Sequence, residues 1–273
     1  MNWFSLRVEP ASQRDEALAA LFAVGAQGVH EDGAMLVTHF PAEADARAAE
    51  RAMASAAPLA RCVIEPTESV DWSTAWRARA TVVALGRLAI APPWLADGLD
   101  AASTVVIDPG MAFGTGDHAS TRGAVRLLDM VARPGMVVAD LGSGSAVLSI
   151  AAARLGASRA WAIESDPDAQ GNAAANVARN GVDDVVHLLE GDAALLLPLV
   201  APVDVVMANI LSSVIIPMLP VMAQALAGGG SAILAGILVT ERSAVLEALG
   251  RSGWHLVRED IEEDWWSALI DRP

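Results

Sequence analysis

Hydrophobic and polar residues follow two different rhythms in the first quarter of the chain. Some segments alternate apolar and polar positions, as a half-buried strand does, and others place apolar residues three and four apart, as a helix does. The strand-like segments are 3–10, 33–40 and 60–66, and the helix-like segments are 12–26 and 42–56. With room for a further short strand near 28–32, this order predicts a small α+β domain of ferredoxin-like fold.

From residue 103 onward, short apolar runs alternate with helical patterns. The predicted strands are 104–109, 136–141, 159–165, 185–191, 204–210 and 231–238, with possible antiparallel edge strands at 254–260 and 265–271. Strands that alternate with helices predict an α/β fold with a doubly wound, Rossmann-like parallel sheet.

Residues 67–95 fit neither pattern. Trp72 and Trp76 are four residues apart and therefore share one helix face, where they could pack a connector onto a domain. The "APPWL" stretch then predicts a rigid turn. We therefore expect a first domain over 1–66, a linker over 67–95 and a second domain over 96–273.

The composition narrows the possible partners. The 273 residues are 53% hydrophobic, so a large core is expected, and the net charge is −15. Such acidity disfavours direct binding of nucleic acid and suits a basic partner or a cationic ligand, although solubility alone explains it equally well. The single cysteine, Cys62, excludes an intramolecular disulfide and fits a reducing compartment, so we expect a cytoplasmic protein. The scattered histidines predict no metal site.

One segment raises the question of a membrane span. Residues 205–240 carry no charge, but Asn209, two prolines and a triple glycine interrupt them. This pattern favours a strand, a helix, a glycine turn and a second strand in a covered sheet. At the N-terminus, Arg7 and Glu9 interrupt any apolar run, so no secretory signal is expected.

The first strand end whose residues could bind a ligand carries Asp140, which is followed by Gly142 and Gly144. Ligands of open parallel sheets bind beyond the carboxyl ends of the strands, and glycines allow the backbone to approach them closely. The dinucleotide fingerprint requires a third glycine where this chain has Val147. A carboxylate at Asp140 would repel pyrophosphate but suits a ligand with an ammonium and a sulfonium group, such as S-adenosylmethionine. A glycine turn without any ligand is the alternative.

Three further strand ends carry polar side chains. Glu164 follows Gly142 by 22 residues, where a carboxylate commonly accepts both ribose hydroxyls, although a solvated loop acid would look the same. Asp192 could accept from an adenine amino group or cap the next helix. Asn209 can bind a ligand or an incoming amine, or it can stabilise a turn.

Residues 108–122, "DPGMAFGTGDHASTR", form a predicted glycine-rich loop that leads into a helix at Ser120 or Thr121. Hydroxyl groups at a helix start can cap the helix or, with its amides, bind a carboxylate such as that of the cofactor's methionine part. We expect the nearby His118 to have no part in catalysis.

These segments together resemble one family, the ribosomal protein L-eleven methyltransferases of the PrmA type, over essentially the whole chain. The segments are "DPGMAFGTGDHAST", "ADLGSGSAVLSIAAARLGA", "DPDAQGNAAANVARNGV", "DVVMANIL" and "LAGIL". The resemblance implies a ferredoxin-like substrate-recognition domain and an S-adenosylmethionine domain. It also implies methyl transfer to lysine ε-amines and the α-amine of a basic ribosomal stalk-base protein. The implied cofactor contacts are Thr121, Gly142, Glu164 and Asn209.

Two residues depart from the family pattern. Ala146 stands where the family has glycine, which places a methyl group at the helix start, and Glu164 stands where the family has aspartate. The implied reaction is an in-line displacement in which Asn209, or a backbone carbonyl beside it, orients the amine, and the sequence offers no obvious general base. The alternatives are a lysine methyltransferase of another protein, a small-molecule methyltransferase, an NAD-dependent oxidoreductase and a non-catalytic binding protein. The sequence does not determine the oligomeric state, and we expect a monomer.

Overall fold

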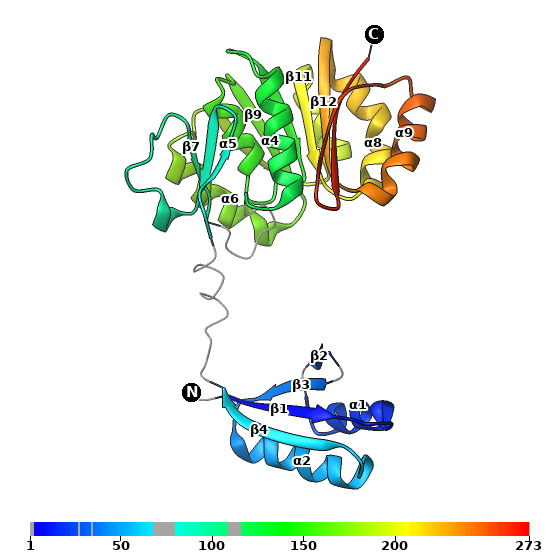
Figure 1. Ribbon diagram of the computed structural model, residues 1–273. Helices are drawn as coiled ribbons and strands as arrows, with labels where there is room; N and C mark the ends of the chain where they lie inside the picture. Colours follow the sequence, from blue (N-terminus) through cyan, green and yellow to red (C-terminus); the bar gives the residue numbers. More distant parts are fainter. Residues whose placement is uncertain (1–2, 27, 34, 68–79, 109–115, 273) are drawn as a thin grey trace. The chain divides into compact units, whose positions relative to one another are not determined.

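The chain divides into two units, Met1–Arg79 and Ala80–Pro273, which we describe separately (Figure 1). The computed structural model describes residues 3–26, 28–33, 35–67, 80–108 and 116–272. The predicted helix face with Trp72 and Trp76 therefore lies outside the described residues, as do Gly110, Phe113 and Gly114 of the predicted loop.

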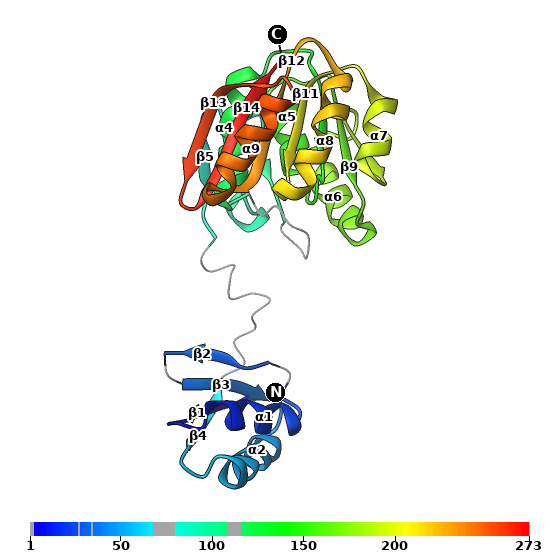
Figure 2. The same ribbon diagram turned by 90° about the vertical axis from the view of Figure 1, so that its right-hand side faces the viewer.

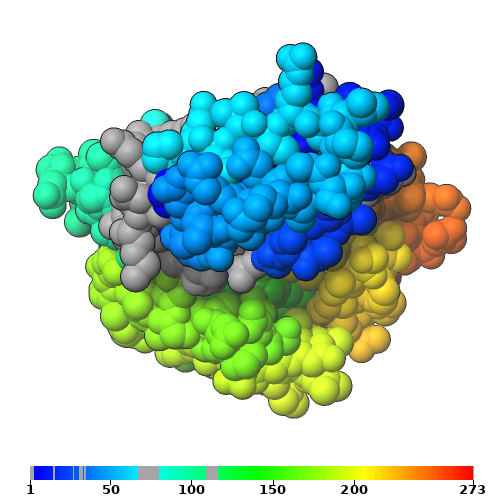
Figure 3. All heavy atoms as spheres, turned by 90° about the horizontal axis from the view of Figure 1, so that it is seen from below, coloured from blue at the N-terminus to red at the C-terminus, as the bar shows by residue number. Residues whose placement is uncertain are grey.

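The first unit is an antiparallel sheet with helices on one face. Its strands lie in the order β2-β3-β1-β4, and buried side chains such as Leu6 and Leu36 pack against Leu21 and Met53 of the helices. The elements are β1 (Trp3–Glu9), α1 (Arg14–Ala23), β2 (His30–Asp32), β3 (Met35–Phe40), α2 (Glu43–Ala56) and β4 (Arg61–Thr67). The outer surface of α2 is visible in Figure 3. This order of elements confirms the predicted ferredoxin-like fold.

The second unit is built on a seven-stranded sheet in the order β10-β9-β8-β11-β12-β14-β13. The first five strands in this order are parallel, and β14 pairs antiparallel with both β12 and β13. The strands are β8 (Val137–Leu141), β9 (Arg159–Glu164), β10 (Val186–Glu190), β11 (Val203–Asn209), β12 (Leu226–Leu238), β13 (His255–Glu262) and β14 (Trp265–Asp271). The doubly wound parallel sheet is confirmed, but of the two added strands only β13 lies at an edge.

Helices cover both faces of this sheet (Figure 2). One core joins the sheet to α4 (Ala119–Val131), α5 (Val147–Arg154) and α6 (Pro167–Asn180). The other joins it to α7 (Ala193–Val200), α8 (Ser212–Ala225) and α9 (Arg242–Arg251). The charge-free segment forms most of β11, α8 and β12, as the pattern predicts. The expected glycine turn is wrong, because the triple glycine lies within β12, where the pairing with β11 shifts register. In the described parts of the chain, no helix has both the length and the apolar character needed to cross a membrane.

The predicted linker differs from the structure. Residues 83–95 fold as β5 (Val83–Leu85), β6 (Leu88–Ala91) and the 3-10 helix η2 (Pro93–Leu95). With β7 (Thr104–Val106), the two strands form a separate three-stranded sheet. The prediction that β7 belongs to the main sheet is therefore wrong. Buried side chains of this small sheet share the core of α4 and α5, which explains why the second unit begins at Ala80.

The departure at Ala146 has a structural consequence. Ala146 is the N-cap of α5, is fully buried, and adopts the left-handed conformation with φ 65° and ψ 20°. Because a side chain at such φ values crowds the backbone, this is a position that glycine normally occupies. A glycine at this position would therefore have a conformational reason, and alanine adds the smallest possible side chain to the same backbone.

Substitutions at Ala146 test this strain. In Ala146→Gly, the strain of the left-handed backbone is relieved, which stabilises the fold by about 1–2 kcal/mol. This gain is offset by the loss of a buried methyl group, about 0.8 kcal/mol, and by the greater conformational freedom of glycine in the unfolded chain. We therefore expect a free energy of unfolding within about 1 kcal/mol of the parent, and a loss of more than about 2 kcal/mol in Ala146→Val, by urea titration. Ala151→Val, equally buried but helical, is the control. Equal losses in the two valine variants would contradict the explanation.

Candidate active site

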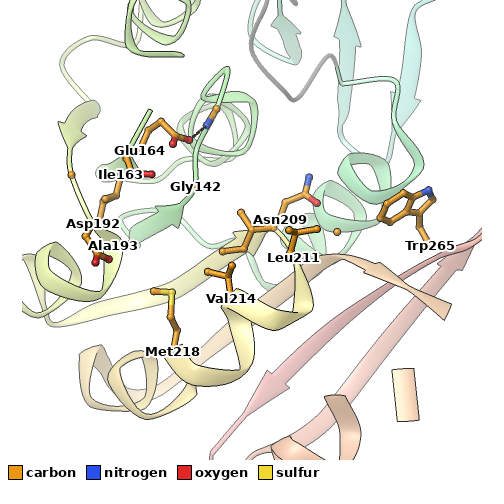
Figure 4. Close-up of a pocket in the computed structure, with 15 residues that line it drawn as sticks. Gly142, Ile163, Glu164, Asp192, Ala193, Asn209, Leu211, Val214, Met218 and Trp265 are labelled. Atoms are coloured by element: carbon orange, nitrogen blue, oxygen red, sulfur yellow. Dashed lines mark hydrogen bonds between the residues drawn. The ribbon is translucent and has the colours of Figure 1, made fainter. Parts of the chain in front are cut away.

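A cleft of about 720 Å³ opens at the carboxyl ends of the parallel strands. Glu164, the last residue of β9, and Asp192, which follows β10, stand at one end, whereas Asn209 ends β11 and Trp265 begins β14 (Figure 4). The glycine turn after β8 also lines the cleft. The structure therefore brings together most of the predicted site residues, in the place where open α/β sheets bind ligands.

The glycine turn after β8 has little room for side chains. Gly142 and Gly144 have φ values of +68° and +50°, which favour glycine. A Cβ at Gly142 would lie 2.5 Å from Cγ2 of Ile210. The amides of Gly142 and Ser143 both donate to the carbonyl oxygen of Ile163. The turn is therefore held to β9, and its backbone is exposed to a ligand.

Glu164 connects two loops at the edge of the cleft. Its Oε2 accepts from the Gly144 amide at 2.9 Å (Figure 4), and its Oε1 accepts from the Asp166 amide at 2.9 Å. A carboxylate can accept about four hydrogen bonds, so both oxygens keep capacity for a diol. The longer glutamate side chain thus stays at the cleft while it braces the glycine turn.

Asp140 takes a different position from the one expected. Its side chain is buried, does not line the cleft, and accepts from the amide and the hydroxyl of Ser149, at 3.1 and 2.8 Å to Oδ2. It therefore joins β8 to α5 beneath the glycine turn. Burial raises the pKa of Asp140 to about 7, despite the hydrogen bonds from Ser149, which act to lower it.

Asn209 offers an unpartnered acceptor. Its Nδ2 donates to Thr121 Oγ1 at 3.2 Å, whereas its buried Oδ1 has no hydrogen-bond partner within the described residues. A buried acceptor without a partner is destabilising and often marks a ligand contact. Gly236 makes room here, since a Cβ at that position would lie 3.0 Å from Oδ1. Thr121 is fully buried and supports Asn209 without lining the cleft.

The N-termini of α7 and α4 lie beside the cleft residues described above. Asp192 caps α7 by accepting from the Ala194 amide at 2.8 Å and also lines the cleft, so the two expected roles are compatible. Helix α4 is capped by His118 instead of by the predicted hydroxyl residues, since His118 Nδ1 accepts from the Ser120 amide. The ring of His118 lies edge-on to Trp265, with the centroids 4.7 Å apart.

The sequence reasoning missed Trp265 and the apolar walls of the cleft, formed by Ile163, Val214 and Met218. Nothing in their local pattern separates these residues from ordinary core positions. Among the described residues that line the cleft, the ionisable side chains are the carboxylates of Glu164 and Asp192. This electrostatic character favours a cationic ligand and opposes a phosphate group.

A family model described as ribosomal protein L11 methyltransferase (PrmA) matches residues 5–273. The chain belongs to this family. A ribosomal protein L11 methyltransferase of Pelotomaculum thermopropionicum is 40% identical over 239 residues, covering 84% of this chain and 77% of the relative. That of Geobacter sulfurreducens is 39% identical over 218 residues, covering 79% and 71%. The solved ribosomal protein L11 methylase of Lactobacillus delbrueckii subsp. bulgaricus has a TM-score of 0.63 and 29% identity, covering 70% of this chain and 98% of that one.

The raised pKa of Asp140 predicts a pH-dependent stability. Because the native state binds this proton more tightly than the unfolded state, the stabilisation is complete below pH 4 and is lost as pH rises to about 7. Between pH 5 and 7, wild-type protein should lose up to about 1.4 kcal/mol per pH unit relative to Asp140→Asn, which keeps the acceptor for Ser149. Urea unfolding at several pH values measures the difference, and a constant difference would contradict the assignment.

Proposed function

We propose that this protein transfers methyl groups from S-adenosylmethionine to lysine ε-amines, the N-terminal α-amine, or both, of ribosomal protein L11. The observation that carries the proposal is the buried, unpartnered Oδ1 of Asn209 in a cleft whose ionisable lining groups are carboxylates. Membership of the family, whose relatives carry this activity in their names, supports the choice of target.

The two ends of the cleft suit the two parts of this cofactor. Glu164 and Asp192 can accept hydrogen bonds from ribose hydroxyls and from an adenine amino group, with Ile163 and Met218 as apolar surfaces. Asn209 and Trp265 lie toward the other end (Figure 4). When bound, S-adenosylmethionine would supply a methyl group activated by a positively charged sulfur. The acceptor nitrogen would bond to the methyl carbon in line with the carbon–sulfur bond, which breaks so that the sulfur leaves as a neutral thioether.

The residues around Asn209 prepare the amine. A lysine amine has a pKa of about 10.4 in water, so it must lose a proton before it can attack. Once the acceptor side chain covers the apolar surfaces of Leu211, Val214 and Trp265, the loss of water contact disfavours the charged ammonium form, and the proton leaves to solvent. Asn209 Oδ1 then accepts from a remaining N–H and orients the lone pair. Glu164 is already bonded to two amides and is a poor candidate for a general base.

The finer assignments belong to the same proposal. The first unit recognises the basic substrate protein. The net charge of the whole chain, −15, favours this basic partner and disfavours direct contact with nucleic acid. We also infer a monomeric, cytoplasmic enzyme. A lysine methyltransferase acting on another protein is the main rival, because the cleft recognises the amine and not the rest of its target.

Intact-mass spectrometry of purified L11 tests the proposal directly. After incubation with the enzyme and S-adenosylmethionine, we expect L11 to gain mass in steps of one methyl group, and peptide mapping then locates the amines. Cofactor binding without added mass would reject L11 as the target but keep the chemistry. Absence of cofactor binding would reject the enzyme assignment.

Replacement of Asn209 tests the mechanism. In Asn209→Ala we expect turnover to fall by about tenfold or more, with weaker cofactor binding, because the acceptor for the amine and the bond to Thr121 are both lost. Thr121→Val removes only the supporting hydroxyl and should have a smaller effect. Single-turnover rates and calorimetric cofactor affinities measure the two losses. Parental values in Asn209→Ala would contradict this role.

A further inference from the structure

Two arginines on α4 form an ion-pair cluster with the β13–β14 hairpin. Arg126 binds Asp260 in a bidentate manner, at 2.9 and 2.5 Å, and also Glu262 at 2.6 Å. Arg122 binds the other oxygen of Glu262, with Nη2 and Nε at 2.6 and 2.8 Å, and Glu263 at 3.2 Å. We call these five residues the hairpin clamp. They lie outside the residues that line the cleft.

The hairpin clamp acts at the position where the hairpin meets the cleft. Glu262 is the cross-strand partner of Trp265, and its carboxylate is shared by both arginines. Arg122 also donates from Nη1 to the carbonyl oxygen of Asp117, which directly precedes His118. His118 packs edge-on against Trp265. The clamp therefore restrains both rings of this contact, Trp265 through its cross-strand partner Glu262 and His118 through the carbonyl group of Asp117.

Two backbone features show how closely the helix and the hairpin fit. Gly123 is on α4 beside Arg122, and a Cβ there would lie 2.6 Å from Ser267 Oγ and 3.2 Å from Asp260 Oδ1. Glycine is unfavourable inside a helix, so this close approach gives it a packing reason. Glu263 has a φ of +55°, a strained conformation for a residue other than glycine, and its carboxylate contacts Arg122.

The cluster is partly shielded from water. The side chains of Arg122 and Glu262 are 17% and 30% exposed, so their attraction is screened less than that of a fully exposed pair. The hydrogen bond from Arg122 lowers the pKa of Glu262, which keeps this carboxylate ionised at neutral pH. A bidentate guanidinium also fixes direction, which a lysine ammonium cannot do equally well.

We propose that Arg122 and Arg126 are positioning residues for methyl transfer. Acting through Glu262, they hold Trp265 as the wall of the cleft beside Asn209, where the acceptor amine enters. This inference rests on the proposed function, because it assigns the Trp265 end of the cleft to the acceptor. It goes beyond that function because it assigns the positioning of the acceptor amine to residues that touch neither substrate nor cofactor.

A second ion pair on the same strand provides a matched control. Arg242 binds Glu259 of β13 at 2.9 Å, and Glu259 also accepts from the indole of Trp266 at 2.8 Å. The side chains of this pair are also partly shielded from water, although at 35% and 36% they are more exposed than those of Arg122 and Glu262. Trp266, however, is fully buried in the core and does not line the cleft. Loss of this pair should therefore lower the free energy of unfolding without changing how the acceptor amine is positioned in the cleft.

The test compares Arg122→Gln, Arg122→Lys and Arg242→Gln. We expect Arg122→Gln to lower kcat/KM for the acceptor protein by about tenfold, because small misplacements of a reacting group are costly. Cofactor affinity by calorimetry should stay within twofold. Arg122→Lys should recover the activity only in part, and Arg242→Gln should match the parent in kcat/KM. An effect below twofold in Arg122→Gln, or an equal effect in Arg242→Gln, would overturn the proposal.

A double-mutant cycle with Trp265→Leu separates positioning from general stability. If Arg122 acts through Trp265, the Arg122→Gln change should alter kcat/KM less than twofold in the Trp265→Leu background. The same tenfold loss in both backgrounds would overturn the proposal.

Hydrogen exchange of the amides in residues 262–266 gives a readout that does not depend on activity. Arg122→Gln should accelerate exchange there, and Arg242→Gln should not. If the parent enzyme methylates nothing, the proposed function fails, while the exchange data still decide whether the clamp holds the hairpin. Unchanged exchange in Arg122→Gln would overturn the proposal even in an active enzyme.

Discussion

The packing of Ile210 between two glycines is the constraint on which the cleft depends. Its side chain occupies the space of a Cβ at Gly142, and its backbone amide lies 2.9 Å from the Cβ position of Gly236. The ends of β8, β11 and β12 can therefore meet only if two of them carry no side chain at these positions. This close approach places Asn209 at the cleft and leaves its buried Oδ1 without a hydrogen-bond partner among the described residues. A larger residue at either glycine would separate the strand ends and the groups that they carry.

Acidic groups surround this junction in two different roles. Glu164 remains at the cleft and holds the glycine turn with one oxygen, so ligand recognition and loop structure share one side chain. Asp140 lies below the turn, where burial favours its protonated form. The site thus presents negative charge only where water or a cationic ligand can stabilise it, and the carboxyl group inside the protein is held by Ser149.

The sequence predicted the parts of the site that follow from strand order. Gly142, Glu164 and Asn209 each stand at the carboxyl end of a strand of the parallel sheet, so they had to converge at one edge. The direction of a side chain at a strand end is not readable in this way, and Asp140 points beneath the turn and not into the cleft. Trp265 could not be predicted, because its position depends on a distant antiparallel pairing with β12. The boundary between the domains was misjudged for a similar reason: β5 and β6 are short, and their partner β7 follows a loop.

The order of strands in the main sheet also constrains how the chain can fold during synthesis. β14 pairs with β12, yet α9 and β13 lie between them in the sequence. A growing chain that has reached β12 therefore has an open, hydrophobic sheet edge until a much later segment arrives. The wall of the cleft that Trp265 provides is added at the same late stage. The second unit consequently gains the strand that covers β12 and the Trp265 wall of its cleft in the same step of synthesis, and nascent chains that stop before β14 are candidates for aggregation or chaperone binding.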